Sequence, residues 1–264
     1  MADLDALLAL AERVASAGAE HLRTWMHHAD LAVSSKDTPT DLVTDVDRSC
    51  ETLVVDLLTS ARPDDGLVAE EGSSIVGRSG VEWVVDPLDG TTNFVYGHPG
   101  FSVSIAAVVD GRPSVGVVAD PLSGDLFSAR AGGGATRNGT VLGLGTPPDL
   151  AHALVATGFS YDAGQRRHQA EVLTTVLPRI RDIRRMGGAA LDLCSVACGR
   201  VDAYYERGLQ PWDMAAGWVI AAEAGARVGD LDGGAPSATC CLAAHPVLFD
   251  ALAALLVTAD PPQR

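Results

Sequence analysis

Basic residues are scarce in this sequence. Its 264 residues include 19 lysines and arginines against 34 aspartates and glutamates, a formal net charge of −15. A surface of this sign repels phosphate backbones, which argues against generic nucleic-acid binding. A small anionic substrate is repelled too, unless something local reverses the field. Bound divalent cations would do so, because they can carry the largest charges in a site.

Cysteines and long apolar runs are also few. The five cysteines are an odd number, and reduced thiols in a cytoplasmic protein are the natural interpretation. Cys194 and Cys198 are expected to be small buried hydrophobes rather than zinc ligands. No apolar run reaches the ~18 residues that span a bilayer, and the acidic N-terminus lacks the basic region of a signal peptide. We therefore expect a soluble, cytoplasmic protein with no membrane partner.

Several common catalytic signatures are missing. The sequence has no Gly-x-Ser-x-Gly elbow, no Walker-type loop, and no Gly-x-Gly-x-x-Gly that opens a helix after a strand. The histidines are scattered, and none has ligand spacing to another beyond the adjacent pair His27 and His28. These absences argue against serine-hydrolase, P-loop and dinucleotide-binding chemistry, and against a histidine metal site.

Periodicity predicts a mixed α/β chain. Helical spacing favours helices over about 4–28, 44–60, 166–177, 187–198 and 212–224, with Thr44 as the N-cap of the second. Strand patterns occur at 66–69, 81–85, 103–109, 114–119, 126–129, 153–157, 183–186 and 201–206, and those between 81 and 129 are typical of an antiparallel meander. No linker or repeat interrupts the chain. We expect one domain over 1–264, with lobes of about 1–140 and 141–264.

Residues 86–92, Asp-Pro-Leu-Asp-Gly-Thr-Thr, carry the strongest functional signal. They follow an apolar strand pattern, so two carboxylates, Asp86 and Asp89, stand at a strand end. Pro87 fixes the backbone, and Gly90 permits a tight turn whose amides can face an anion if a helix starts there. An Asp-Gly pair alone is typical of a capped turn. The whole segment instead indicates phosphoryl transfer, with carboxylates for Mg²⁺ beside amides for phosphate.

Two further acidic positions have ordinary alternatives. Glu70 and Glu71 follow a strand pattern, and their repulsion suggests that one is a metal ligand, although a solvated charge pair explains them equally well. Asp213 follows Trp212 at a predicted helix start, where an aspartate is most often a cap. The presence of the first motif favours a metal role for Asp213.

These segments resemble the inositol monophosphatase family. Residues 86–94 resemble its first signature and residues 212–217 its second. Other segments similar in order and spacing are Lys36, 41–47, 70–72, 187–193 and 199–206. The resemblance covers nearly the whole chain. It implies an α/β fold, a layered α-β-α-β-α sandwich of the inositol monophosphatase/fructose-1,6-bisphosphatase type, and a homodimer.

The resemblance also implies roles for single residues. The ligands that it implies for two or three Mg²⁺ ions are Glu70, Asp86, the carbonyl of Leu88, Asp89 and Asp213. The catalytic residues are Glu70 and Thr91, which orient the attacking water, and Asp47, which polarises Thr91. The implied substrate contacts are Leu88, Asp89, Gly90, Thr91, Gly187, Gly188, Ala189, Glu206 and Asp213. Lys36 is expected to act electrostatically near the metals.

The implied reaction is direct in-line attack on phosphorus by a metal-activated water, without a phosphoenzyme. The expected substrate is a small phosphorylated polyol, first of all inositol 1-phosphate, because Glu206 can accept hydrogen bonds from vicinal ring hydroxyls. Gly188, where many relatives have Ser or Thr, and the variable position Gln210 leave the alcohol open. Histidinol phosphate, fructose 1,6-bisphosphate and 3′-phosphoadenosine 5′-phosphate are alternatives. The family further implies inhibition by Li⁺, and a protein-binding regulatory role is the alternative of another class.

Overall fold

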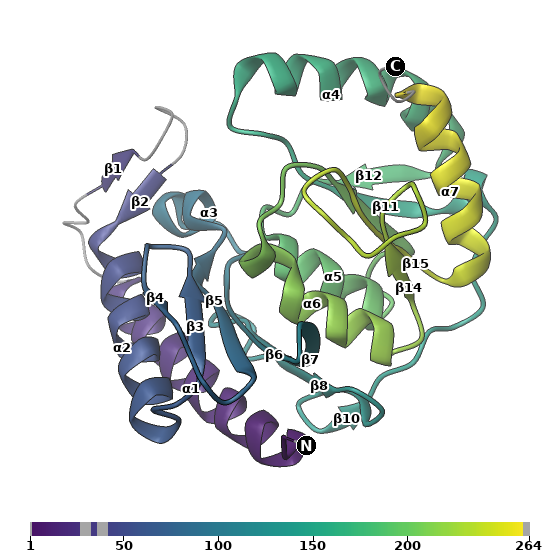
Figure 1. The fold of residues 1–264 in the computed structure, drawn as a ribbon. Helices are drawn as coiled ribbons and strands as arrows, with labels where there is room; N and C mark the ends of the chain where they lie inside the picture. The colour runs from purple at the N-terminus through teal and green to yellow at the C-terminus, as the bar shows by residue number, and fades with distance from the viewer. Residues whose placement is uncertain (1, 27–32, 36–41, 261–264) are drawn as a thin grey trace.

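The computed structural model describes residues 2–26, 33–35 and 42–260. Its elements stack in five layers, helix–sheet–helix–sheet–helix, which confirms the predicted sandwich (Figure 1). The outer and middle layers are helical: α1 (Leu4–Trp25) with α2 (Asp45–Ala61), α5 (Ala189–Ala197) with α6 (Pro211–Glu223), and α4 (Ala163–Val176) with α7 (Pro246–Ala259). Two sheets lie between these helix pairs.

The first sheet has eight strands in the order β10-β9-β8-β7-β6-β5-β3-β4. Their bounds are β3 Gly66–Ala69, β4 Ser74–Ile75, β5 Val81–Asp89, β6 Ser102–Val109, β7 Arg112–Ala119, β8 Leu126–Arg130, β9 Gly134–Arg137 and β10 Thr140–Val141. Strands β5 to β8 form the expected antiparallel meander. Trp83 and Val85 face α1 and α2, whereas Val84 faces α5 and α6. Helices cover both faces, so β5 is an apolar run rather than an alternating strand.

The second sheet has five strands in the order β12-β11-β13-β15-β14. Their bounds are β11 Leu154–Thr157, β12 Asp182–Arg184, β13 Ala203–Glu206, β14 Arg227–Gly229 and β15 Cys241–Ala244. Helix α5 is buried along its whole length, because Ala190 packs toward the first sheet and Leu193 toward the second. Cys194, as predicted, is buried in this apolar layer, whereas Cys198, just after the helix, is only half-buried.

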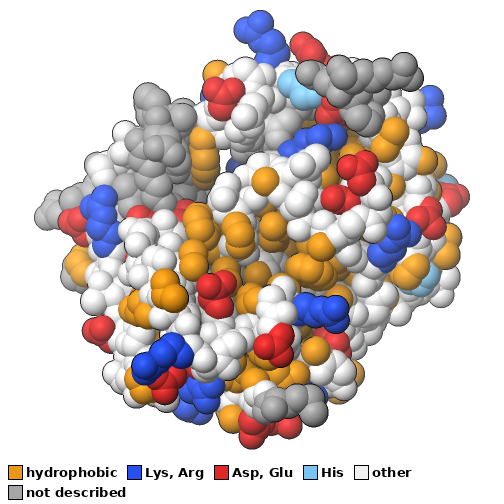
Figure 2. All heavy atoms as spheres, in the orientation of Figure 1, with side chains coloured by type: hydrophobic (Ala, Val, Ile, Leu, Met, Phe, Trp, Pro, Cys, Tyr) orange, Lys and Arg blue, Asp and Glu red, His pale blue; other side chains and the backbone are white. Residues whose placement is uncertain are grey.

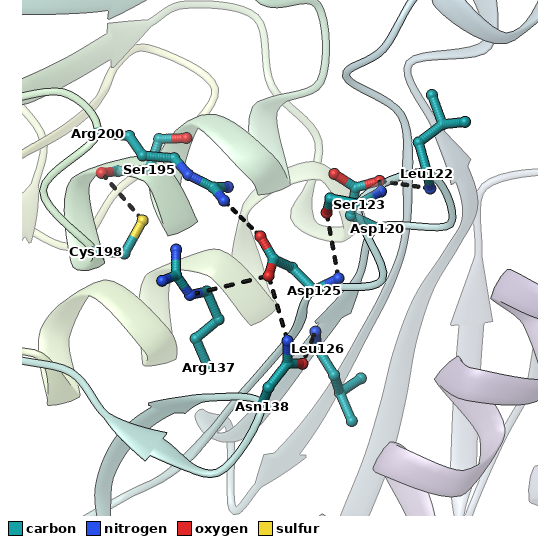
Figure 3. A network of polar contacts seen from close by, with 10 residues as sticks. All are labelled: Asp120, Leu122, Ser123, Asp125, Leu126, Arg137, Asn138, Ser195, Cys198 and Arg200. Carbon is teal, nitrogen blue, oxygen red and sulfur yellow. Dashed lines mark hydrogen bonds and ion pairs between the residues drawn. The ribbon is translucent and has the colours of Figure 1, made fainter.

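The two halves of the chain interlock. The chain leaves the first sheet after β10, yet α5 and α6 from the second half pack on the first sheet. Polar contacts reinforce this packing (Figure 3). Asp125, just before β8, accepts a hydrogen bond of 2.5 Å from Arg200, which follows α5, and pairs with Arg137 of β9. The boundary between the halves is therefore a packed interface, and the cavity described below opens along it.

Several short elements have no counterpart in the sequence prediction. They are the hairpin β1 (Val33–Ser35) with β2 (Leu42–Thr44), β4, helix α3 (Thr91–Tyr96), β9, β10, β14, β15 and α7. Most have six residues or fewer, too short to show a period. Within the described residues, no helix combines the length and the hydropathy needed to cross a bilayer.

Candidate active site

A cavity lies where β5 and β13 meet the N-termini of three helices. Thr91 begins α3, Ala189 begins α5 and Asp213 lies in the first turn of α6. The N-terminus of a helix carries partial positive charge, so these three ends offset acidic groups. The cavity lining is Glu70, Asp86, Leu88, Asp89, Gly90, Thr91, Gly158, Phe159, Tyr161, Arg185, Gly187, Ala189, Asp192, Glu206, Leu209 and Asp213.

The end of β5 brings Asp86 and Asp89 into the cavity wall. The pairing of β5 with β6 is interrupted between these two residues, at Pro87, which has no N–H to donate. The Asp86 carboxylate accepts the Leu88 amide at 3.0 Å. Both aspartates are buried, with exposed fractions of 1% and 8%. Local backbone geometry therefore turns two buried carboxylates toward one side.

Asp89 also caps a helix from a distant part of the chain. Its two oxygens accept the amides of Ala189 (3.2 Å) and Ala190 (2.8 Å) at the start of α5. The N-cap of that helix is Gly188, which has no side chain to accept them. A Cβ at position 188 would lie 2.9 Å from the nearer Asp89 oxygen. The missing hydroxyl at Gly188 is thus matched by a carboxylate that fills its role.

Thr91 is connected to Asp47 at the start of α2. The Thr91 hydroxyl lies 2.8 Å from Asp47 Oδ1 and 3.1 Å from the Leu88 carbonyl oxygen. The other oxygen, Asp47 Oδ2, accepts both the amide (2.8 Å) and the hydroxyl (2.5 Å) of Thr44, the predicted N-cap of α2. This capping box holds the fully buried Asp47 in a fixed orientation. Asp47 in turn orients the Thr91 hydroxyl at the cavity edge.

The turn after β5 requires glycine. Gly90 has φ of 90°, and a Cβ there would lie 2.6 Å from the carbonyl oxygen of Gly100. Helix α3 starts at the next residue, as the anion-binding interpretation required. Asn93 of this helix donates to the carbonyls of Gly100 (2.9 Å) and Met186 (2.6 Å). It therefore joins the turn of the first motif to the segment that leads into Gly187.

The acidic groups perturb one another. Burial, followed by the charges of Glu70, Asp89 and Asp213, raises the pKa of Asp86 well above its ordinary value. Burial and then Asp213 do the same to the pKa of Asp89, although the Ala190 amide opposes them. Buried carboxylates that lie close to one another attract protons or cations. The cavity is electrostatically prepared for a positive ion.

The donor set fits a hard divalent cation. It consists of four carboxylates and the Leu88 carbonyl, all oxygen, which is what Mg²⁺ prefers. In the part of the chain that the structure describes, however, no three Asp, Glu, His or Cys side chains converge closely enough to hold one ion. Backbone amides explain this separation: Asp86 and Asp89 accept the amides given above, and Asp213 accepts that of Gln210 at 2.7 Å. A cation would compete with these bonds for the same oxygens.

Glu206 forms another part of the cavity wall, at the end of β13. Tyr204 donates to Glu206 Oε2 at 2.8 Å. A Cβ on Gly158 would lie 2.1 Å from both Glu206 oxygens, so the carboxylate occupies the space that a side chain at 158 would need. Burial raises the pKa of Glu206, while Tyr204 and Arg185 oppose that shift. This wall can accept hydrogen bonds from a bound alcohol.

The structure brings most of the predicted site residues together. All of them line the cavity except Asp47, which reaches it through Thr91, and Gly188, which lies between the lining residues Gly187 and Ala189. Gln210 is exposed and lies beside the lining residue Leu209. Lys36 lies outside the described residues. The sequence interpretation gave no role to Gly158, Arg185 or Asp192. A lone aspartate in the apolar helix α5 was the available signal for the last of these.

Comparison with known proteins agrees with this geometry. The profile of the inositol monophosphatase family matches residues 3–260. The chain belongs to the inositol monophosphatase family. Inositol-1-monophosphatase SuhB of Mycobacterium tuberculosis (strain ATCC 25618 / H37Rv) is 50% identical over 208 residues, covering 75% of this chain and 72% of that protein. Nus factor SuhB of Vibrio cholerae is 41% identical over 232 residues, 86% of each chain.

Solved structures of this family share the fold. The extragenic suppressor protein SuhB of Bartonella henselae superposes with a TM-score of 0.90 at 36% identity, covering 95% of this chain and 98% of that structure. Family membership supports phosphatase activity, and dependence on a metal ion is a family property. The acidic cavity is the part of this chain that suits such chemistry.

Proposed function

We propose that this chain is a Mg²⁺-dependent phosphomonoester hydrolase that acts on small phosphorylated polyols and prefers inositol 1-phosphate. The observation that carries the proposal is a single cavity with two different walls. One wall has Glu70, Asp86, Asp89 and Asp213 beside Thr91, and the other has Glu206. The first suits metal ions and a phosphate, and the second suits alcohol hydroxyls.

Each residue then has a defined part. Glu70, Asp86, the Leu88 carbonyl, Asp89 and Asp213 would hold two or three Mg²⁺ ions, which supply an activated water and stabilise the leaving alkoxide. Thr91, whose hydroxyl lies 2.8 Å from Asp47, would act with Glu70 to orient and activate the water for attack. The amides of Gly90 and Thr91 would donate hydrogen bonds to the phosphate oxygens. Gly187, Gly188 and Ala189, together with Glu206, contact the alcohol.

A substrate panel tests this proposal. Purified protein with Mg²⁺ should hydrolyse myo-inositol 1-phosphate faster than histidinol phosphate, fructose 1,6-bisphosphate or 3′-phosphoadenosine 5′-phosphate. Asp86→Asn should lower kcat by at least about 100-fold, because it removes a charged metal ligand. Asp120→Asn, a change at a half-buried residue outside the cavity, is the matched control. Absence of inositol phosphate turnover would contradict the assignment of inositol 1-phosphate as the preferred substrate.

A second candidate function is a regulatory role through protein binding, beside or instead of catalysis. A relative named Nus factor SuhB, 41% identical to this chain, favours it. Asp86→Asn discriminates between the two functions. A complex with a partner protein should survive this substitution if binding is independent of catalysis, whereas hydrolysis should collapse.

Three further properties belong to this proposal. We expect a homodimer, a cytoplasmic location, and inhibition by Li⁺ through competition at a metal position. Hydrophobic side chains gather across the middle of one face (Figure 2), and such a surface is compatible with a subunit contact. Sedimentation at several protein concentrations tests the dimer. Rates measured with and without Li⁺ test the inhibition.

A further inference from the structure

Asp192 has no part in the proposed reaction, although it lines the cavity. Only 1% of its surface is exposed. Its Oδ1 atom is buried without a hydrogen-bond partner among the described residues. Only two other side-chain atoms in the described chain share this state, on Thr92 and Ser102, and neither residue lines the cavity or carries a charge. A buried carboxylate oxygen without a partner is unfavourable, so its presence needs an explanation.

The surroundings of Asp192 lie on the alcohol side of the cavity. Burial and then the charge of Glu206 raise the pKa of Asp192 well above its ordinary value, while Arg185 opposes that shift. The exposed Arg185 lines the same cavity and also opposes the shift at Glu206. Two carboxylates therefore share one guanidinium. The wall is rich in hydrogen-bond acceptors.

Helix α5 aims Asp192 at this wall. The residues around it, Ala190, Leu191 and Leu193, are buried in the two apolar cores on either side of the helix. Asp192 instead faces the cavity between the two halves of the chain. A hydrocarbon side chain at this position would satisfy the helix without leaving a polar atom unpaired. The carboxylate is consequently a feature of the cavity rather than of the core.

We propose that Asp192 is a substrate-binding residue, whose carboxylate accepts a hydrogen bond from a hydroxyl group of the alcohol beside the one bound by Glu206. A hydroxyl suits this position better than a cation, because Arg185 already supplies positive charge to both carboxylates. Asp192 thereby distinguishes polyol phosphates from phosphomonoesters without hydroxyls. This inference rests on the phosphatase function proposed above and adds a specificity-determining residue to it.

Two variants and two substrates test the inference. The substrates are myo-inositol 1-phosphate and 4-nitrophenyl phosphate, which has a ring of similar size without hydroxyls. With Mg²⁺ present, Asp192→Ala should raise KM for the inositol ester about tenfold, the effect of losing one hydrogen bond to a charged acceptor. Its kcat should stay within about threefold, and KM for the nitrophenyl ester should not change. Asp192→Asn retains an acceptor oxygen and should show a smaller increase.

Thermal unfolding separates binding from a structural role. Both variants remove an unpaired buried carboxylate, so Tm should rise or stay constant. Ser195→Ala, a buried change on the same helix outside the cavity, is the matched control. A fall in Tm with equal changes in KM for both substrates would overturn the inference, as would an unchanged ratio of the two KM values.

The two proposals fail in different ways. If wild-type protein hydrolyses 4-nitrophenyl phosphate but not the inositol ester, the proposed substrate is wrong, and the assignment of Asp192 falls with it. If wild-type protein hydrolyses both esters and the Asp192 variants keep the wild-type ratio of KM values, only the role of Asp192 is wrong.

Discussion

At the scale of single residues, the smallest side chains shape this cavity as much as the acidic ones. Gly188 leaves the amides of α5 to Asp89, and Gly158 leaves room for Glu206. The position of each carboxylate depends on the absence of a Cβ atom elsewhere in the chain. Substituting such a glycine therefore tests the role of a carboxylate without removing the carboxylate.

Gly158→Ala should reproduce the loss of Glu206. The new Cβ would lie 2.1 Å from both Glu206 oxygens, and the carboxylate must move because it is the flexible partner. We expect KM for myo-inositol 1-phosphate to rise about tenfold, equivalent to about 1.4 kcal/mol. The free energy of unfolding should fall by about 1–3 kcal/mol. Steady-state kinetics and urea denaturation measure both quantities.

Gly143→Ala is the matched control for this substitution. Position 143 has no atom within 4 Å of an added Cβ and no positive φ. If the two alanine variants have the same KM for the inositol ester, Gly158 does not position Glu206.

At the scale of elements, α3 connects the turn at Gly90 to the segment before Gly187 through hydrogen bonds of Asn93. Asn93 Nδ2 lies within hydrogen-bond distance of the carbonyls of Pro99, Gly100 and Met186. The carbonyl oxygen of Gly100 lies 2.6 Å from where a Cβ on Gly90 would be, and Met186 precedes the turn at Gly187. The turn at Gly90 and the turn at Gly187 are therefore connected through one amide group.

Asn93→Asp should weaken this connection more than Asn93→Ala. An aspartate places a charged acceptor against three carbonyl oxygens, whereas alanine only removes the donor. We expect a loss of about 2–3 kcal/mol in unfolding free energy for Asp and about 1–2 kcal/mol for Ala. The ratio kcat/KM should fall in both variants, most in Asn93→Asp.

Asp125→Ala provides a comparison away from the site. It removes the partly exposed pairs with Arg200 and Arg137 that tie α5 to the first sheet (Figure 3). Stability should fall by about 1 kcal/mol while KM stays constant. An Asn93 variant that loses stability but keeps a wild-type kcat/KM would show that the Asn93 hydrogen bonds do not position the site.

At the scale of the whole molecule, the negative charge of the chain is concentrated where the two halves meet. Six carboxylates line one cavity, and three helix N-termini offset them only in part. Folding the metal-free chain therefore brings like charges together at a cost. Anything that neutralises them, a proton or a divalent cation, should stabilise the folded state.

The metal-free protein should become more stable as the pH falls. The folded pKa values of Asp86 and Asp89 lie well above the ordinary value of 3.8. Between the folded and the ordinary values, the folded state binds more protons than the unfolded state, so stability increases as pH falls through the raised values and is lost as pH rises through them. The gain ends near pH 3.8, where the unfolded groups also bind protons.

Thermal unfolding in a chelator, and in excess Mg²⁺, measures this dependence. Mg²⁺ should raise Tm most at the upper end of the pH range, where protons do not compete for the carboxylates. Asp86→Asn removes one raised group and should flatten the pH dependence of the chelated protein. A chelated wild-type protein whose Tm rises with pH across this range would contradict the assignment of unfavourable charge to this cluster.

The sequence alone determined the features that depend on neighbours in the chain. Thr44 caps α2 as predicted, and the apolar strand pattern before Asp86 runs into the tight turn at Gly90, because caps and tight turns act over a few residues. The family signatures also allowed the layered fold to be predicted, although short elements such as α3 and β15 had no period to reveal them.

Only the tertiary structure decided which groups from distant segments come into contact around the cavity. Asp89 caps a helix that begins 100 residues later, and Glu206 fills the space beside Gly158. Asp192 lies in an apolar stretch that predicts burial, but periodicity does not distinguish a core from the wall of a cavity. These pairings depend on how α5 and α6 are held between two sheets, and contacts between distant segments leave no local pattern in the sequence.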